Sequence, residues 1–445
     1  MFVSKRNLLF KSGKYGYLLF CGNSNSFFRL DDENVPVIKK MFETGDDSEL
    51  PEDIRKEFIK TGVLLKESDE EFFKRLKFIS YQSRFNPYFL SLTIAPTMAC
   101  NFKCVYCYEG DRVQNVTMTD EVIDGLIKFI KKGEYKTLYL TWYGGEPLCA
   151  WEKVKTINDK IKELKIPNVI HNIVTNGSLI DDEKIKFFID NNFQLIQITV
   201  DGDEKIHNER RPMKNGGNSF KSIMTNLDRI YEYCQKENKS LPINVRVNVD
   251  KNNLEFYKNF YEQMNKKYNY FFNIYPGFVG KNSEKDCHAD SCLNSVEASS
   301  FILELAEKYD IPCVDLYPIK NTLTGCGAQS VNTYVVSSNG DLYRCWDDIG
   351  LKEYLVGNVV SGIKDEHNLI QSQVMESSGF EEPKCKDCLF LYSCMGGCPK
   401  RRMVNKKEGK EINPVCVKIK NLPEQFLESY YTLKQKYEKK ESVNN

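Results

Sequence analysis

Apolar residues recur along this chain in two periods, and each period predicts a different kind of element. A short apolar run between turn residues is typical of a strand, whereas apolar residues three and four apart indicate an amphipathic helix. In the first 80 residues, strand-like runs lie at 8–10, 17–21, 26–30 and 63–65, and helical patterns lie at 35–42 and 51–61. Asp31 or Asp32 would cap the first helix, and Gly62 would end the second. The pattern predicts a small module with a three-stranded sheet and short helices.

From residue 88 onward, strand and helix patterns alternate. The predicted strands lie at 89–94, 138–142, 172–175, 195–200, 243–249 and 271–275, and the predicted helices at 121–132, 154–164, 182–189, 220–237 and 254–266. Such alternation indicates a parallel sheet with right-handed crossovers. In barrels of parallel strands, chemistry takes place at the carboxyl ends of the strands. We therefore expect an α/β fold whose functional residues follow the strands.

The last third of the chain is less regular. A helix is expected at 296–309, and the Asn339-Gly340 pair predicts a hairpin with a type I′ turn. A closing helix is expected at 426–437, followed by a disordered tail from Glu438.

Charge and hydropathy exclude several classes of function. Lys plus Arg and Asp plus Glu both number 62, so the net charge is zero and neither nucleic acid nor an anionic membrane is an expected partner. No segment has the apolar length of a signal peptide core or of a membrane span. We expect a cytoplasmic protein.

Cysteine supplies the first chemical signal. The chain has sixteen cysteines, and Cys100, Cys104 and Cys107 are spaced C-x3-C-x2-C directly after the first predicted barrel strand. Three thiolates on one loop can hold three irons of a cubane [4Fe-4S] cluster and leave the fourth iron open. A zinc loop remains an alternative, because cysteine spacing alone does not name the metal. Isolated cysteines are expected to be small core residues; they are Cys21, Cys149, Cys234 and Cys313.

Short polar motifs follow the later strands. Gly144-Gly145-Glu146 follows the second strand, where two residues without Cβ would let a ligand approach the backbone beside a carboxylate. Asn176 and Thr199 lie at the ends of the next two strands and suit ribose hydroxyls or a ligand carboxylate. Arg246, inside the fifth strand, predicts an anionic partner. His207 is expected to be structural.

A second cysteine array lies near the C-terminus. It comprises Cys326, Cys345, Cys385, Cys388, Cys394, Cys398 and Cys416. Seven thiolates are too many for one tetrahedral zinc ion and one short of two fully ligated cubanes.

Together the two arrays and the Gly-Gly-Glu motif resemble the radical S-adenosylmethionine (SAM) superfamily with a SPASM extension. The resemblance implies SAM and three [4Fe-4S] clusters, one that binds SAM and two auxiliary ones. It assigns Cys385, Cys388, Cys394 and Cys416 to an outer auxiliary cluster and Cys326, Cys345 and Cys398 to an inner one. The expected SAM contacts are Tyr106, Gly144, Gly145, Glu146, Asn176, Thr199 and Arg246.

The inner set departs from the part of the family that has an eighth cysteine shortly after the first. The inner cluster would then keep an open iron or take Cys287, Cys292 or Cys313 as its fourth ligand. An open iron could bind a substrate thiolate. Asp347 and Asp348 are candidate proton acceptors beside Cys345, with a solvated acidic turn as the alternative.

The resemblance also implies a division of the chain. We expect a winged-helix-like domain at 1–80 that binds the leader segment of a precursor peptide and a partial (β/α)6 TIM-like barrel at 81–285. A bridging region at 286–325, a SPASM domain at 326–420 and a C-terminal helix and tail at 421–445 would follow. Leader binding by strand addition needs only a free sheet edge.

The implied function is radical SAM modification of a ribosomally made precursor peptide, most simply formation of a cysteine thioether as in sactipeptide and ranthipeptide maturases. A flavodoxin or ferredoxin would donate electrons. The alternatives are an anaerobic sulfatase-maturing enzyme, which makes formylglycine, a carbon-carbon crosslinking or epimerising maturase, and a non-catalytic zinc scaffold.

Overall fold

The computed structural model describes residues 1–110, 114–279, 291–318, 324–409, 411 and 415–444. The chain divides into two compact units. The first contains Met1–Asn86, Ser295–Val331 and Gln371–Asn445, and the second contains Pro87–Asn294 and Asn332–Ile370. The five-part division expected from the sequence stays a prediction. No helix in the described residues is long and apolar enough to cross a membrane.

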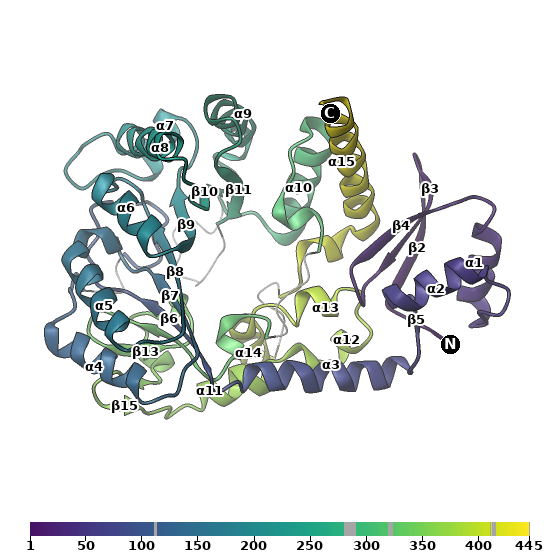
Figure 1. Cartoon of the computed structure of the whole chain (residues 1–445), viewed down its shortest axis with the longest axis horizontal. Coiled ribbons are helices and arrows are strands. Elements are labelled where there is room, and N and C mark those ends of the chain that lie inside the picture. The colour runs from purple at the N-terminus through teal and green to yellow at the C-terminus, as the bar shows by residue number, and fades with distance from the viewer. Residues whose placement is uncertain (111–113, 280–290, 319–323, 410, 412–414, 445) are drawn as a thin grey trace. The chain divides into compact units, whose positions relative to one another are not determined.

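The second unit is built on one large sheet (Figure 1). Six parallel strands pair in chain order: β6 (Phe89–Ile94), β7 (Thr137–Trp142), β8 (Asn168–Thr175), β9 (Phe193–Thr199), β10 (Ile243–Val249) and β11 (Asn273–Phe278). The connecting helices are α4 (Asp120–Lys131), α5 (Trp151–Glu163), α6 (Asp182–Asp190), α7 (Glu204–Arg210), α8 (Ser219–Lys236) and α9 (Tyr257–Tyr268). The α/β fold with a parallel sheet is confirmed, and α7 is an element that the pattern did not predict.

The sheet does not close on itself. The outer edge of β6 pairs in parallel with β12 (Thr333–Val336), and β13 (Asp341–Tyr343), β14 (Gly357–Asn358) and β15 (Gly362–Ile363) continue the sheet antiparallel. β12 and β13 form the expected hairpin, but the type I′ turn is wrong. That turn needs positive φ at both central residues, whereas Gly340 (φ 86°) has it and Asn339 does not. The Gly340 N–H instead donates to Ser337 O at 2.9 Å, as in a turn followed by one left-handed residue.

The two faces of the sheet differ in polarity. Along β10, Val245, Val247 and Val249 are buried, whereas the intervening Arg246 and Asn248 are partly exposed. Alternate residues of a strand point to opposite faces, and the helices α4 to α9 lie along one face (Figure 1). The apolar face therefore packs on the helices, and the polar face is left for a ligand.

In the first unit, the N-terminal module has the expected three-stranded antiparallel sheet. It comprises β2 (Asn7–Ser12), β3 (Gly16–Cys21) and β4 (Ser26–Leu30), followed by α1 (Val35–Thr44) and α2 (Glu52–Thr61). The apolar run at 63–65 does not join this sheet, because β5 (Leu64–Leu65) pairs with β1 (Phe2–Val3). Gly62 ends α2 in a left-handed conformation as expected, but the cap of α1 is Asn34, without a side-chain hydrogen bond.

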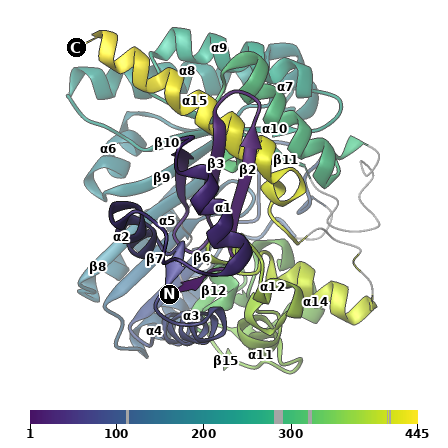
Figure 2. The ribbon, with the colours of Figure 1, turned by 90° about the vertical axis from the view of Figure 1, so that its right-hand side faces the viewer.

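The module sheet is covered on both faces. Leu19 and Cys21 of β3 pack with Ile38 and Phe58 of the two helices. The opposite face packs on α15 (Pro423–Asn444), where the Phe27 ring lies 5.8 Å from that of Tyr431. Figure 2 shows α15 crossing β2 and β3. The expected disordered tail is wrong, because α15 continues to Asn444.

A long helix, α3 (Asp69–Arg84), leaves the module and packs on the cysteine-rich part of the same unit. Ser68 and Glu71 form a capping box at its start. Leu76 is buried in a cluster with Phe380, Cys385 and Leu391. This helix therefore supports the C-terminal cysteine region.

Candidate functional site

Cys100, Cys104 and Cys107 lie on the loop after β6, at the carboxyl edge of the parallel strands. The Cys100 Sγ accepts a hydrogen bond from the Phe102 N–H at 3.4 Å. Burial raises the pKa of the Cys100 thiol to about 12, and it also raises the pKa of Cys104. Buried thiols of this kind ionise readily only when a cation takes the proton's place. The loop therefore suits a bound metal cluster.

A distant segment of the chain holds this loop in place. Residues 101–105 lie beside residues 210–214, which begin at the last residue of α7. The backbone hydrogen bonds are Lys103 N to Pro212 O (2.8 Å), Val105 N to Arg210 O (3.0 Å) and Lys214 N to Asn101 O (2.9 Å). The shape of the cysteine loop thus depends on residues more than a hundred positions later.

Positions 144 and 145 require glycine because the chain segment before the cysteines lies close to the backbone of Gly144 and Gly145. A Cβ at Gly144 would lie 2.5 Å from Thr97 O, and a Cβ at Gly145 would lie 2.4 Å from Met98 O. The Glu146 N–H donates to Ala99 O at 3.0 Å in the same contact. The Cβ position of each glycine is therefore occupied by the chain before Cys100. The contact of Gly144 and Gly145 with SAM stays a prediction.

Glu146 is buried, and its carboxylate accepts hydrogen bonds from residues that follow β7 and from residues at the end of β8. Its Oε1 accepts from Thr175 Oγ1 at 2.7 Å and from the Leu148 N–H at 3.0 Å, and its Oε2 accepts from the Asn176 N–H at 2.7 Å. Burial raises the pKa of Glu146, and these hydrogen bonds oppose the shift. Oε2 keeps room for one further donor, because a carboxylate oxygen can accept two.

Asn176 connects the end of β8 to the cysteine loop. Its Nδ2 donates to Asn101 Oδ1 at 2.8 Å, and its own Oδ1 accepts from the Ser178 N–H at 2.9 Å. The amide is buried. Asn176 therefore positions the loop residue next to Cys100.

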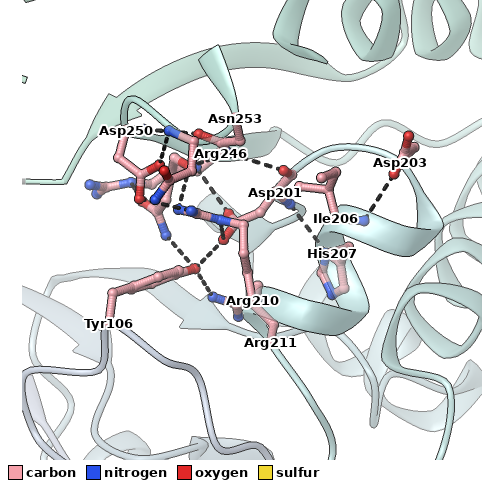
Figure 3. Close-up of polar contacts among 12 residues, drawn as sticks. Tyr106, Asp201, Asp203, Ile206, His207, Arg210, Arg211, Arg246, Asp250 and Asn253 are labelled. Atoms are coloured by element: carbon pink, nitrogen blue, oxygen red, sulfur yellow. Dashed lines mark hydrogen bonds and ion pairs between the residues drawn. The ribbon is translucent and has the colours of Figure 1, made fainter. Parts of the chain in front are cut away.

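Asp201, after β9, is the centre of a polar network that reaches the cysteine loop (Figure 3). Its Oδ2 accepts from the hydroxyl of Tyr106 and from Arg210 Nε (3.3 Å), and its Oδ1 accepts from the Asn248 N–H at 3.0 Å. His207 Nδ1 accepts from the Asp201 N–H at 3.1 Å, which gives His207 the structural role expected of it. One carboxylate therefore ties together Tyr106, α7 and the end of β10.

Two arginines complete this network. Arg210 Nη1 pairs with Asp250 Oδ2 at 2.7 Å, and Arg211 Nη1 donates to the Tyr106 hydroxyl at 2.8 Å. Burial alone would lower the pKa of Arg211, but the Cys104 thiolate and the Tyr106 hydroxyl raise it above its usual value. Arg211 is thus a permanent buried cation beside the cysteine loop.

Arg246 and Thr199 are neighbours across β10 and β9. Arg246 Nε donates to Asn248 Oδ1 at 2.8 Å, and the guanidinium lies over Gly277, where a Cβ would approach Nε to 2.2 Å. Asn248 is a neutral acceptor, so this hydrogen bond leaves the charge of Arg246 for an anion on the polar face of the sheet.

Four of the C-terminal cysteines come together in the first unit. Cys385, Cys388, Cys394 and Cys416 line one pocket, together with Arg402 and Lys420. Arg402 Nη2 lies 3.8 Å from Cys385 Sγ, and Lys420 Nζ lies 3.7 Å from Cys416 Sγ, both as hydrogen-bond donors. Thiols that converge with cations directed at their sulfurs fit a metal–thiolate cluster, whose net charge is negative.

Comparison with protein families agrees with the geometry of the barrel loop. Residues 94–256 match the model of the radical SAM superfamily. This segment is a radical SAM domain. It contains the cysteine loop, the Gly-Gly-Glu turn and the Asp201 network.

Relatives match over more than the radical SAM domain. The chain is 26% identical over 362 residues to the serine-type anaerobic sulfatase-maturating enzyme of Bacteroides thetaiotaomicron, which covers 71% of this chain and 84% of that protein. It is 25% identical over 359 residues to the cysteine-type enzyme of Clostridium novyi, covering 75% and 94%.

Solved structures share the fold. One is native anSMEcpe with bound AdoMet and Kp18Cys peptide, with a TM-score of 0.61, 22% identity, and 78% of this chain and 98% of that chain covered. Another is Streptococcus suis SuiB bound to precursor peptide SuiA, with a TM-score of 0.52, 15% identity, and 94% and 99% covered. At these identities the likeness establishes the fold.

The inner cysteine set stays a prediction. Cys326 and Cys398 belong to the first unit, whereas Cys345 belongs to the second. Cys287 lies outside the described residues. Cys313 is buried, and burial raises the pKa of its thiol to about 12. No set of three or more His, Cys, Asp and Glu side chains in the described ranges is arranged as a site for a single metal ion.

Asp347 and Asp348 follow Cys345 in a short helical turn. Asp348 is completely buried, so it is not part of a solvated acidic turn. Burial and then the Asp347 carboxylate raise the pKa of Glu109 to about 7. The role of Asp347 and Asp348 as proton acceptors stays a prediction.

Three contributions to the radical SAM domain were missed in the sequence. Asn248 and Asp250 carry no motif of their own, and Arg211 ends a segment, Asp201 to Arg211, that resembles the family pattern D-G-x-x-x-x-H-x-x-x-R but gave no role for the arginine. Only the pairing of strands and the position of α7 bring these three residues to Tyr106. Cys149 was expected in the core but is exposed. Its position three residues after Glu146 was the available signal.

Proposed function

We propose that this protein is a radical SAM enzyme that modifies a peptide substrate. The observation that carries the proposal is the three-cysteine loop at the carboxyl edge of the radical SAM domain, braced by Glu146 and Asp201. Bound there, a reduced [4Fe-4S] cluster and SAM would supply a 5'-deoxyadenosyl radical, which takes a hydrogen atom from the substrate.

The chain's own residues would hold SAM and exclude water. Glu146 Oε2 and the backbone around Gly145 are acceptors for the amino group of SAM. Arg246, with a neutral hydrogen-bond partner on the polar face of the sheet, suits its carboxylate. Thr199 and Asn176 stand at neighbouring strand ends, where the ribose would lie. Tyr106 shapes the loop through Asp201 and Arg211.

The N-terminal module is proposed to bind the substrate's leader segment. Gly22 N donates to Arg6 O, so every second residue of β2, counted from Arg6, forms its backbone hydrogen bonds with β3. The residues between them, Asn7, Leu9 and Lys11, direct their backbone N–H and C=O groups away from β3. By the same alternation, Phe27 and Arg29 of β4 face outward. Among the described residues no backbone hydrogen bond occupies these edge positions, which leaves them available to an added strand.

The share of this chain that each similar protein covers supports a module that the matches to sulfatase-maturating enzymes do not include. Those relatives cover 71% and 75% of this chain, whereas SuiB covers 94%. Residues 1–86 of the first unit amount to about a fifth of the chain. SuiB was crystallised with a bound precursor peptide, SuiA, and we propose the same class of substrate for this chain.

We propose thioether formation as the reaction. When bound, SAM and the clusters would supply the removal of one hydrogen atom from a substrate carbon and the uptake of one electron as that carbon bonds to a cysteine sulfur of the same peptide. In this chain, a carboxylate such as Asp347 would accept the thiol proton. The product therefore lacks two hydrogens and keeps its sulfur.

The second candidate is formation of formylglycine, which the sulfatase-maturating relatives favour. A cysteine substrate would then lose its sulfur, and a serine substrate would lose two hydrogens. Both products are aldehydes, which a thioether is not.

SAM cleavage is the first test. Anaerobically reconstituted, reduced protein should convert SAM into 5'-deoxyadenosine, and the Cys100→Ala variant should not. Cys234→Ala, which removes a buried thiol on α8, is the matched control and should keep full turnover. Unchanged turnover in Cys100→Ala would refute the assignment of the loop.

Mass spectrometry with a hydrazide probe separates the two reactions. A candidate precursor with a cysteine-containing core should lose two hydrogens and its free thiol without reacting with the hydrazide. A hydrazide-reactive product from a sulfatase-derived cysteine or serine peptide would establish formylglycine formation instead.

Leader binding is best tested on the sheet edges. Deleting the whole module would also remove Arg6 and α3, which contact the cysteine-rich region. Lys11→Pro and Arg29→Pro remove an outward-facing N–H from each edge in turn. At least one variant should bind the precursor about tenfold more weakly and keep SAM cleavage. Unchanged binding in both would reject strand addition.

A further inference from the structure

The outer four-cysteine pocket contains two cations that the reaction described above does not use. Arg402, on α14 (Pro399–Glu408), is 3% exposed and reaches Cys385 Sγ through Nη2. Lys420 reaches Cys416 Sγ, and both residues are part of the pocket lining. Two of the four thiols therefore each receive a hydrogen bond from a charged donor.

Arg402 is held in this position by the chain around it. Nη2 also donates to Gly396 O at 2.6 Å, and Nη1 pairs with Glu382 Oε2 at 2.9 Å. Its Nε is buried without a partner among the described residues. Desolvating a guanidinium is costly, so this arrangement needs a negative charge in the pocket beyond that of Glu382.

Lys420 faces the same group of thiols. Its Nζ donates to Cys416 Sγ at 3.7 Å, and the side chain lines the same pocket as Cys385 and Cys388. Arg402 Nη2 donates to Cys385 Sγ at 3.8 Å. The cations and the thiolates thus stabilise one another across the pocket.

We propose that Arg402 and Lys420 raise the reduction potential of the outer cluster and make it the electron acceptor of the reaction. The proposal rests on the proposed function, which places a [4Fe-4S] cluster on these four thiolates. Such a cluster is negatively charged, and one-electron reduction adds a further negative charge. Cations and N–H donors at the sulfurs therefore stabilise the reduced form more than the oxidised form.

Nearby carboxylates weaken the effect of the two cations on the reduction potential of the outer cluster but do not reverse it. Glu382 offsets part of the charge of Arg402. Arg6, a third buried cation in this unit, is paired with Asp69 at 3.0 Å and adds little. The carboxylates do not remove the hydrogen bonds that Arg402 and Lys420 donate to Cys385 and Cys416. Arg402 and Lys420 are positioning residues, because they act on the cluster's ligands and not on the substrate.

The test is potentiometry of the full-length, reconstituted protein followed by electron paramagnetic resonance. The signal of the outer cluster is the component that disappears in Cys388→Ala. In Arg402→Gln and in Lys420→Gln its midpoint should become more negative. For Arg402→Gln we expect at least a tenfold change in the ratio of oxidised to reduced cluster at fixed potential, which is about 59 mV for one electron. A smaller shift in the same direction is expected for Lys420→Gln.

Lys407→Gln is the matched control, because Lys407 is exposed on the same helix as Arg402 and its loss changes the net charge equally. Its midpoint should equal that of the unaltered protein. An unmoved midpoint in Lys420→Gln and Arg402→Gln, or an equal shift in Lys407→Gln, would overturn the proposal. If Arg402→Gln loses iron, Lys420→Gln decides alone. The absence of any Cys388-dependent signal in the unaltered protein would instead refute the cluster assignment and hence the proposed function.

Discussion

The two cysteine regions of this protein are stabilised in different ways. The barrel loop with Cys100, Cys104 and Cys107 is held by backbone hydrogen bonds of residues 97–99 to residues 145–146, by those of residues 101–105 to residues 210–214, and by the network of Asp201. The C-terminal pocket is built mainly from short helices close to its own cysteines, with Arg402 and Lys420 directed at the sulfurs. The first region depends on strand ends far apart in sequence. The second combines local turns and charge with support from α3 and Arg6.

This difference fits two separate tasks. A site that must leave one iron open for a ligand needs a loop whose shape is imposed from outside, because three thiolates alone do not enclose the cluster. A site that binds a cluster through four thiolates is enclosed by its ligands, and its surroundings are then free to adjust its potential. The substitutions below are expected to separate the two regions.

Gly145→Ala should have the largest effect. The added Cβ would lie 2.4 Å from Met98 O and 2.6 Å from Ala99 O, so the backbone before Cys100 has to move. We expect the loss of the barrel cluster, about four irons per chain, and the loss of SAM cleavage, with the C-terminal irons retained. Iron analysis and 5'-deoxyadenosine formation check this result. Gly13→Ala, where nothing lies within 4 Å of the added Cβ, is the control.

Gly396→Ala is the converse experiment in the C-terminal region. Gly396 has φ 98°, and its added Cβ would lie 2.4 Å from Gly379 N. The turn between Cys394 and Cys398 must then open, so the outer cluster should be lost while SAM cleavage continues. If Gly396→Ala loses both the outer cluster and SAM cleavage, the two regions are not independent.

Asp201→Asn should have an intermediate effect confined to the barrel. The substitution removes the charge that pairs with Arg210 and weakens hydrogen bonds to Tyr106 and Asn248. Hydrogen bonds to a charged group contribute about 2 kcal/mol, and Arg210 keeps Asp250 as a partner. We expect a lower midpoint of urea denaturation and weaker SAM binding. The electron paramagnetic resonance signal of the outer cluster, which depends on Cys388, should be unchanged and is the internal control.

Tyr106→Phe should have the smallest effect. It removes one hydroxyl that accepts from Arg211 and Asn248 and donates to Asp201. The expected cost is about 1–2 kcal/mol, because the ring stays in place under Arg210. Calorimetry of SAM binding should show a drop of several-fold. Complete loss of binding would mean that Tyr106 contacts SAM directly.

Much of the fold follows from short-range patterns. The six parallel strands were located within a few residues because each is a β-branched or apolar run bounded by turn residues, and β6 and β10 were placed with their observed bounds. The turn at Asn339 and the cap of α1 were wrong. Both depend on the backbone angles of single residues, which neighbouring elements adjust at little cost.

The candidate site could be predicted only in part. Cysteine spacing marks ligands without reference to the rest of the chain, and the strand ends explain why Glu146 and Asn176 lie near the cysteine loop. Asn248 and Arg402 have no such signature. A basic or amide side chain becomes part of a site only when folding brings a thiol or a carboxylate to it.

The sequence by itself determined the α/β order, the cysteine groups and the absence of charge bias, because each is a property of composition or of spacing along one element. Only the tertiary structure decided why Gly144 and Gly145 are glycines, which donors Glu146 accepts from, and which cations face the outer thiols. These relations depend on side-chain directions and on the approach of separate segments, which arise only when burial of apolar surface packs the chain.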